Sequence, residues 1–203
     1  MKEYPSLKRE LIRKPIYAFD KLDGSQIRAE WDKKKGFWKF GTRRQLLDST
    51  HENFGEAPDL VRAKYERDLS DIFKKEKLQK VVCFFEFSGL SSFAGTHEDE
   101  NHDVVLFDIK VHKKGLVLPK DFLKMVGHLD IPRVLYQGNA NEILAERVRD
   151  SELEGMTFEG VVCKAQEYST PGVPFMFKLK SKAWLNKLRG YCKDDEELFK
   201  RLE

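Results

Sequence analysis

Short apolar runs separated by polar turns recur along the chain and predict β-strands. Residues 26–31 and 37–41 flank a polar turn that ends in glycine, which is typical of a β-hairpin. Residues 81–87 form a continuous apolar run that contains one carboxylate, Glu86, and this pattern predicts a buried strand. Further strands are expected over residues 16–19, 104–111, 115–118, 160–164 and 174–180.

Helical spacing is clearest over residues 57–76, where Val61, Tyr65, Leu69 and Phe73 lie on one side of the predicted helix. Helices are also expected over residues 119–129, 139–150, 184–189 and 196–202, with Asn139 as the N-cap of the second of these. Many strands joined by short turns, with helices between them, predict an α+β domain built on antiparallel sheet.

Composition narrows the class of protein. The chain has 203 residues, which suits one domain, and its net charge of +3 is too small to indicate nucleic-acid binding by itself. No segment has the pattern of a secretory signal or the length of a membrane span. The three cysteines include no C-x-x-C pair, so we expect a cytoplasmic protein with neither a disulfide framework nor a zinc knuckle.

Lys21 precedes an Asp-Gly turn and is a candidate nucleophile. A lysine attacks a phosphate only as the free amine. At the usual lysine pKa, roughly one side chain in a thousand is in this neutral form near pH 7.4. Positive charge nearby lowers that pKa, and we expect Lys178, Lys180 and a divalent metal to supply it. The alternative is an ordinary surface lysine beside a turn.

Lys178 and Lys180 lie two residues apart on a predicted strand. Strand alternation therefore directs both ammonium groups to one face, while Phe177 and Leu179 face the other. Two ammonium groups on one face of an otherwise apolar segment suit an anion. The alternative is a strand face exposed to solvent.

Other candidates stand at the ends of predicted strands or inside them. Burying the carboxylate of Glu86 within its apolar run costs free energy unless the group has a hydrogen-bonding or charged partner. The alternative is that Glu86 lies on an edge strand and faces water. Glu159 directly precedes an apolar strand, and its alternative is a plain turn residue. Phe107 is a core residue by default. Arg43 and Arg44 follow a strand and suit phosphate contact or a solvated loop equally well.

The order of these short motifs resembles that of the covalent nucleotidyltransferase superfamily, which contains DNA ligases, RNA ligases and mRNA capping enzymes. Within it, the chain is most similar to ATP-dependent RNA ligases. The motifs that carry the resemblance are Lys21-Leu22-Asp23-Gly24, Phe84-Phe85-Glu86, Phe107-Asp108-Ile109, Glu159-Gly160-Val161-Val162-Cys163-Lys164 and Lys178-Leu179-Lys180.

The resemblance implies a reaction. Lys21 would attack ATP, release pyrophosphate and carry AMP, which then passes to an RNA 5′-phosphate before a 3′-hydroxyl closes the phosphodiester bond. Lys178 and Lys180 would contact the α-phosphate, with Mg²⁺ or Mn²⁺ as the metal. The substrate would be nicked or single-stranded RNA, with DNA also possible, and no membrane is involved.

The resemblance also implies the nucleotide contacts. Glu86 would bind the ribose hydroxyls, Phe107 would stack on the purine, and Glu159 would help to hold the metal. Arg43 would correspond to the arginine after the lysine motif that, in this family, contacts phosphate or the nicked strand. Arg44 is the second candidate for this position.

Residues 1–203 are expected to form one adenylation domain with flanking helices and no C-terminal OB domain, because few residues follow Lys180. A partner protein or a missing domain would then help to hold the nucleic acid. A DNA ligase or capping-type guanylyltransferase domain remains an alternative, as does a nucleotide- or RNA-binding module without catalysis.

Overall fold

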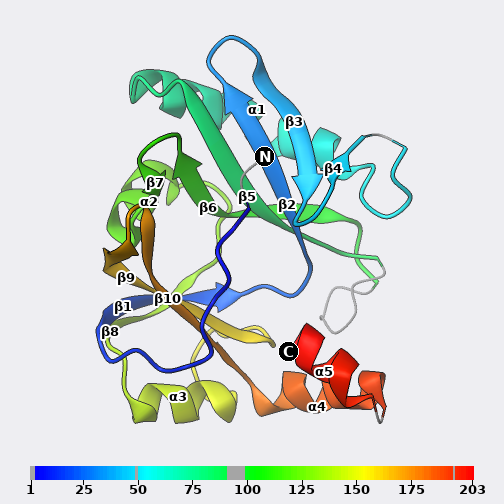
Figure 1. Ribbon diagram of the computed structural model, residues 1–203, viewed down its shortest axis with the longest axis vertical. Helices are drawn as coiled ribbons and strands as arrows, with labels where there is room; N and C mark the ends of the chain where they lie inside the picture. Colours follow the sequence, from blue (N-terminus) through cyan, green and yellow to red (C-terminus); the bar gives the residue numbers. More distant parts are fainter. Residues whose placement is uncertain (1–2, 49, 91–98, 194) are drawn as a thin grey trace.

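The computed structural model describes residues 3–48, 50–90, 99–193 and 195–203, which form two antiparallel sheets with helices on their outer sides (Figure 1). The larger sheet contains β2 (Ser25–Asp32), β3 (Gly36–Thr42), β4 (Leu46–Leu47), β5 (Lys80–Ser88), β6 (Asp103–Val111) and β7 (Gly115–Leu116). Its strand order is β4-β3-β2-β5-β6-β7.

The smaller sheet contains β1 (Pro15–Lys21), β8 (Val134–Asn139), β9 (Gly160–Thr170) and β10 (Val173–Lys180), in the order β10-β9-β1-β8. The helices are α1 (Ala57–Lys75), α2 (Pro119–Val126), α3 (Glu142–Arg149), α4 (Lys182–Cys192) and α5 (Glu196–Leu202). The expectation of an α+β fold on antiparallel sheet is therefore confirmed.

Helix α1 covers one face of the larger sheet. Its buried stripe, which includes Tyr65, Leu69 and Phe73, packs in one cluster with the inward-facing residues of the sheet. Burial of this apolar area is the main source of stability in this half of the molecule. The alternate positions of β5, which include Phe84 and Glu86, lie on the opposite face, toward the smaller sheet.

The smaller sheet buries its outer face against α3, through a cluster that includes Leu144, Val148 and Phe177. Between the sheets lies another cluster, formed by Tyr4, Phe84, Leu116 and Met176. The N-terminal segment thus crosses the space between the sheets, as the dark blue trace in Figure 1 shows.

Most of the predicted elements are confirmed, but the helix predicted over residues 139–150 begins later than expected. Asn139 ends β8, a strand that the sequence did not predict, and pairs with Pro15 of β1. The N-cap is Asn141, whose side chain accepts a hydrogen bond from Leu144 N at 2.9 Å. Two asparagines so close together are equivalent as local cap signals, and strand pairing decides between them.

Candidate active site

The register of the smaller sheet brings three charged residues together. Gly160 of β9 pairs with Lys21 at the end of β1 on one side and with Lys180 at the end of β10 on the other. Glu159 directly precedes Gly160, so its carboxylate lies between the two ammonium groups. Lys21 Nζ is 2.7 Å from Glu159 Oε2, and Lys180 Nζ is 2.8 Å from Glu159 Oε1.

Backbone geometry fixes Glu159 in this position. Gly160 has a φ of +141°, and a Cβ atom there would lie 2.0 Å from the carbonyl oxygen of Leu179, so only glycine fits. Ser181 N donates a hydrogen bond of 2.9 Å to the carbonyl oxygen of Glu159. The carboxylate therefore points from a rigid strand end rather than from a mobile loop.

The charges of this cluster are strongly coupled. Burial alone would raise the pKa of Glu159, but Lys21 and Lys180 outweigh burial and hold it below its usual value. Burial alone would lower the pKa of Lys21, but Glu159 and Glu86 outweigh it and raise the pKa. The expectation that neighbouring cations depress the pKa of Lys21 is therefore wrong for the protein without ligands, because the carboxylates act more strongly on it.

Glu86 reaches the cluster from the larger sheet. The Asp23-Gly24 turn joins β1 to β2, and a Cβ atom on Gly24 would lie 2.3 Å from the carbonyl oxygen of Phe87, so glycine permits this close approach. Burial, opposed by Lys21, raises the pKa of Glu86 to about 8. The carboxyl group is thus mostly protonated at neutral pH and is able to donate a hydrogen bond.

Lys178 lies on the same strand face as Lys180, as strand alternation predicts. Its ammonium group donates a hydrogen bond to a main-chain oxygen of Glu203, the last residue of the sequence. Burial, followed by the charges of Lys180, Lys21 and Arg9, lowers the pKa of Lys178 to about 8. Three lysines thus meet at this end of β10, where Glu159, Asp23 and Glu203 act on them.

A cavity of about 250 Å³ opens beside these lysines, and Arg9, Arg149, Lys178 and Lys180 line it. Arg9 Nη1 also contacts Glu203 Oε2 at 2.7 Å. The sequence analysis missed Arg9, because nothing in the charged N-terminal stretch distinguishes it from its neighbours. Glu203 also lines the cavity, and a polyanion that displaced it would meet four cationic side chains.

Phe107 lies on the face of the larger sheet that meets the smaller one. Its ring is partly buried and contacts Tyr4 edge-on, with ring centroids 5.2 Å apart, while Phe84 lies at 6.2 Å. Tyr4 donates a hydrogen bond of 2.8 Å to Asp108 Oδ2. No sequence signal identified Tyr4, since an aromatic residue near a chain start is common.

The two arginines after β3 lie at the surface. Arg43 Nη2 donates a hydrogen bond of 3.1 Å to Ser6 Oγ in the N-terminal segment, and the backbone N–H of Arg44 donates one of 3.3 Å to Thr42 Oγ1. Arg43 thus contacts the segment that crosses between the sheets, and its phosphate-binding role stays a prediction.

Trp184 supports the lysine cluster from α4. Lys180 Nζ lies 3.4 Å from the centroid of the Trp184 ring, a cation–π contact. The indole N–H donates a 3.4 Å hydrogen bond to Asp23 Oδ1. Ser181, the N-cap of α4, accepts from Trp184 N at 3.0 Å and so fixes the start of the helix. Sequence reasoning missed this tryptophan, although the cap residue three positions earlier was readable.

Comparison with known proteins explains the arrangement. Residues 14–180 match the sequence model of the RNA ligase family. The chain belongs to this family. No curated protein sequence matches it significantly. Lys21, Glu86, Lys178 and Lys180 lie on β1, β5 and β10, and Glu159 directly precedes β9.

Solved structures of one RNA ligase share this fold. A mutant of Naegleria gruberi RNA ligase with ATP and Mn matches with a TM-score of 0.64 and 20% identity, over 86% of this chain and 52% of that one. Another mutant, with AMP and Mn, matches with a TM-score of 0.64 and 19% identity, over 91% of this chain and 59% of that one. This chain thus spans little more than half the length of these relatives, whose likeness shows the fold alone.

No helix among the described residues is long and apolar enough to cross a membrane. The thiols of Cys83, Cys163 and Cys192 are free and buried, and burial raises the pKa of Cys83 and Cys163. These thiols are therefore unsuited to nucleophilic chemistry.

Proposed function

We propose that residues 1–203 act as one adenylation domain of an ATP-dependent RNA ligase. The observation that carries this proposal is the carboxylate of Glu159, bonded to Lys21 on one side and to Lys180 on the other, beside a third lysine with a lowered pKa. Perturbed titratable groups of this kind cluster at reactive sites. The RNA ligases of similar fold are bound to ATP, or to AMP, with Mn.

The first step transfers AMP to Lys21. The neutral amine attacks the α-phosphorus of ATP, and a bond forms between Nζ and phosphorus. The bond from that phosphorus to the β-phosphate oxygen breaks, the electron pair leaves with pyrophosphate, and a proton leaves the nitrogen. Lys178 and Lys180 stabilise the charge that develops on the phosphate oxygens.

The carboxylate set fits a divalent cation. Mg²⁺ and Mn²⁺ prefer carboxylate oxygens, and Mg²⁺ is commonly held by one or two carboxylates together with substrate phosphates. The described residues contain no group of three or more potential ligands of the kind that forms an all-protein site, which agrees with a site completed by phosphates. A divalent cation at Glu159 would neutralise the charge that raises the pKa of Lys21 and so favour the free amine.

The cavity beside β10 suits the departing phosphates. Arg9 and Arg149 extend the positive charge of Lys178 away from Lys21. Glu203 now occupies hydrogen-bonding groups of both Arg9 and Lys178. Binding of the triphosphate would replace the contacts of Glu203 with contacts from phosphate oxygens, which are also charge-assisted.

The remaining nucleotide contacts follow the family pattern. Glu86 would bind the ribose hydroxyls, Phe107 would stack on the purine, and Arg43 would contact phosphate. The RNA 5′-phosphate would then attack the AMP phosphorus and release Lys21, and a 3′-hydroxyl would displace AMP to join the ends. The reaction would take place in the cytoplasm, where the buried thiols stay reduced.

Intact-mass measurement after incubation with ATP and Mg²⁺ tests the proposal. The expected result is one added AMP that acid releases, because a phosphoamide bond is acid-labile. Lys21→Ala should form no adduct while its circular dichroism spectrum shows that it is folded, whereas the matched surface variant Lys182→Ala should label normally. An adduct on another lysine would refute the assignment of Lys21. Labelling by GTP alone would identify a guanylyltransferase, and no label would favour a binding module.

A further inference from the structure

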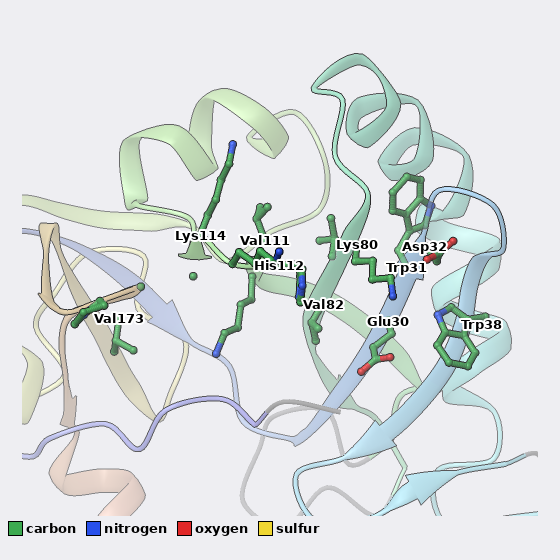
Figure 2. Close-up of a pocket in the computed structure, with 16 residues that line it drawn as sticks. Glu30, Trp31, Asp32, Trp38, Lys80, Val82, Val111, His112, Lys114 and Val173 are labelled. Carbon is green, nitrogen blue, oxygen red and sulfur yellow. The ribbon is translucent and has the colours of Figure 1, made fainter.

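A second groove, of about 370 Å³, lies where the open face of the larger sheet meets the tip of the β9–β10 hairpin (Figure 2). It belongs to no part of the nucleotide site described above. Its lining residues come from β2, β3, β5, β6, the β6–β7 turn and the β9–β10 turn. Those that matter here are Glu30, Trp38, Lys80, Lys110, Lys113 and Lys114.

The groove continues the strand face that holds the nucleotide site. Val82 lines the groove, and Glu86 stands four residues further along β5. Both side chains lie on the same face because strand residues alternate. The rise of a strand puts roughly 13 Å between them. Phe84, which lies between them on this face, is buried under Tyr4, Leu116 and Met176, so this cluster separates the groove from the nucleotide site.

Positive charge dominates the groove. Lys80, Lys110, Lys113 and Lys114 line it, against the carboxylates of Glu30 and Asp32. The lining thus holds four lysines and two carboxylates, and Asp32 Oδ1 accepts a hydrogen bond of 2.9 Å from Lys34 N in the β2–β3 turn.

That turn adds Lys33, Lys34 and Lys35 at the edge of the groove, all of them exposed. The overall charge of +3 hides this concentration, because acidic residues elsewhere balance it. The groove therefore presents a local positive field to a polyanion.

Trp38 provides an aromatic surface at the same place. Of the three tryptophans only this one is exposed, with 46% of its surface accessible, whereas Trp31 and Trp184 are buried. Figure 2 shows its indole at the edge of the groove, beside Glu30. The ammonium groups of Lys35 and Lys39 lie 4.4 and 5.7 Å from its ring centroid. Aromatic rings interleaved with cations are typical of surfaces that bind single-stranded nucleic acid.

The groove is held open by backbone contacts. Leu116 N donates a hydrogen bond of 2.8 Å to the carbonyl oxygen of Gly172, which joins β7 to the tip of the β9–β10 hairpin. A Cβ atom on Gly115 would lie 2.1 Å from the Cα atom of Gly172, so two glycines let the backbones meet. The two sheets thus form a preorganised floor, which lowers the cost of binding.

We propose that this groove binds a single-stranded segment of the RNA substrate, with a base stacked on Trp38 and phosphates beside the lysines. The inference rests on the proposed RNA ligase function. A single strand fits better than a duplex, because only an unpaired base is free to stack on an indole ring. The groove and the nucleotide site share one face of β5, with the cluster of Tyr4, Phe84, Leu116 and Met176 between them.

The charge contribution is tested by fluorescence anisotropy with a labelled single-stranded RNA over a range of salt concentrations. Lys80→Gln with Lys114→Gln should weaken binding and reduce the slope of log Kd against log salt by about 1.4, the value expected when two phosphate contacts to a single strand are lost. Lys74→Gln with Lys75→Gln, at the exposed end of α1, removes the same charge from the other side of the sheet and should change neither quantity beyond error.

The aromatic contribution is tested in the same assay. Trp38→Ala should weaken RNA binding on the order of 10-fold at fixed salt, while Trp38→Phe, which keeps a stacking surface, should retain most of it. Ile143→Ala, an exposed apolar side chain on α3, is the matched control. All variants should keep the wild-type unfolding temperature, because the altered side chains are exposed.

Lysyl-AMP formation separates this inference from the proposed function. Every groove variant should form the adduct at the wild-type rate, since none of them touches the lysine cluster. Groove variants that bind RNA like the wild type, or a control pair that weakens binding as much as Lys80→Gln with Lys114→Gln, would overturn the RNA groove and leave the ligase proposal intact. Absence of the adduct in the wild type would overturn the ligase proposal by itself.

Discussion

Two buried clusters of lysine and carboxylate lie close together between the sheets, yet they differ in how their charges are matched. The open cluster contains Lys21, Glu159 and Lys180, where two ammonium groups share one carboxylate. The closed cluster contains Lys164 and Asp108, with a distance of 2.8 Å between Lys164 Nζ and Asp108 Oδ2.

In the closed cluster, the charged atoms form their hydrogen bonds with other groups of the protein. Lys164 Nζ also donates to the carbonyl oxygen of Phe107 at 3.0 Å, and it lies 5.1 Å from the ring centroid of Phe19. Tyr4 donates a second hydrogen bond to Asp108. Both charged side chains are at most 5% exposed, so no space is left for a ligand. This cluster joins β9 to β6 and holds the two sheets in position.

The open cluster brings several lysines together and borders a cavity. Lys178 adds a third ammonium group whose pKa is lowered to about 8, and Lys21 remains 20% exposed at its side chain. The contrast teaches that burial of an ion pair does not by itself indicate function. Unmatched charge beside an accessible cavity does, because a ligand is needed to balance it.

The largest expected effect breaks the closed cluster. Lys164→Met removes the partner of a buried carboxylate, and this should lower the free energy of unfolding by about 3–5 kcal/mol. Urea denaturation followed by circular dichroism measures the change. Lys182→Met breaks the exposed ion pair with Asp150 and should lower the free energy of unfolding by less than about 1 kcal/mol.

A double variant sharpens this result. Asp108→Asn combined with Lys164→Met removes both charges, so it should be less destabilised than the two single variants predict by addition. Additive losses would show that the two side chains do not stabilise the fold as a pair. The closed cluster would then have to be reinterpreted.

The next effect breaks the open cluster. Lys178→Ala and Lys180→Ala should each reduce the rate of lysyl-AMP formation by about 10²–10³, because each removes preorganised charge aimed at the α-phosphate. Single-turnover labelling with ATP measures the rate. Lys182→Ala is the matched control, since Lys182 begins α4 and pairs with Asp150 at 2.6 Å. Equal losses at Lys180 and Lys182 would contradict the assignment of the open cluster to phosphate.

The open cluster was largely predictable from the sequence, and the closed cluster was not. Strand alternation placed Lys178 and Lys180 on one face, and the apolar run around Glu86 indicated a carboxylate in need of a partner. The pairing of Lys164 with Asp108 depends instead on which strands face each other across the sheets. No local pattern encodes that arrangement.

Long-range contacts also explain the other differences. Tyr4 and Arg9 reach the site because the N-terminal segment runs along β10, where Lys178 N donates to the carbonyl oxygen of Lys8 at 2.9 Å. The raised pKa of Lys21 follows from Glu159 and Glu86, which come from two different sheets. Sequence spacing identified these residue types but could not give the balance of charges among them.

The smallest expected effect concerns the charge of Glu86. Its pKa of about 8 in the folded protein lies above the usual value of 4.5, so the folded state binds the proton more tightly than the unfolded state does. This contribution to stability is complete below about pH 4.5 and is lost as the pH rises through 8. Glu86→Gln removes this titration, so the stability of the variant relative to the wild type should rise by about 2–3 kcal/mol between pH 6 and pH 9. Urea denaturation at both pH values measures the difference, with the exposed Glu146→Gln as the control. A constant difference between the two pH values would mean that Glu86 is charged throughout, and that Lys21 balances it more strongly than burial opposes it.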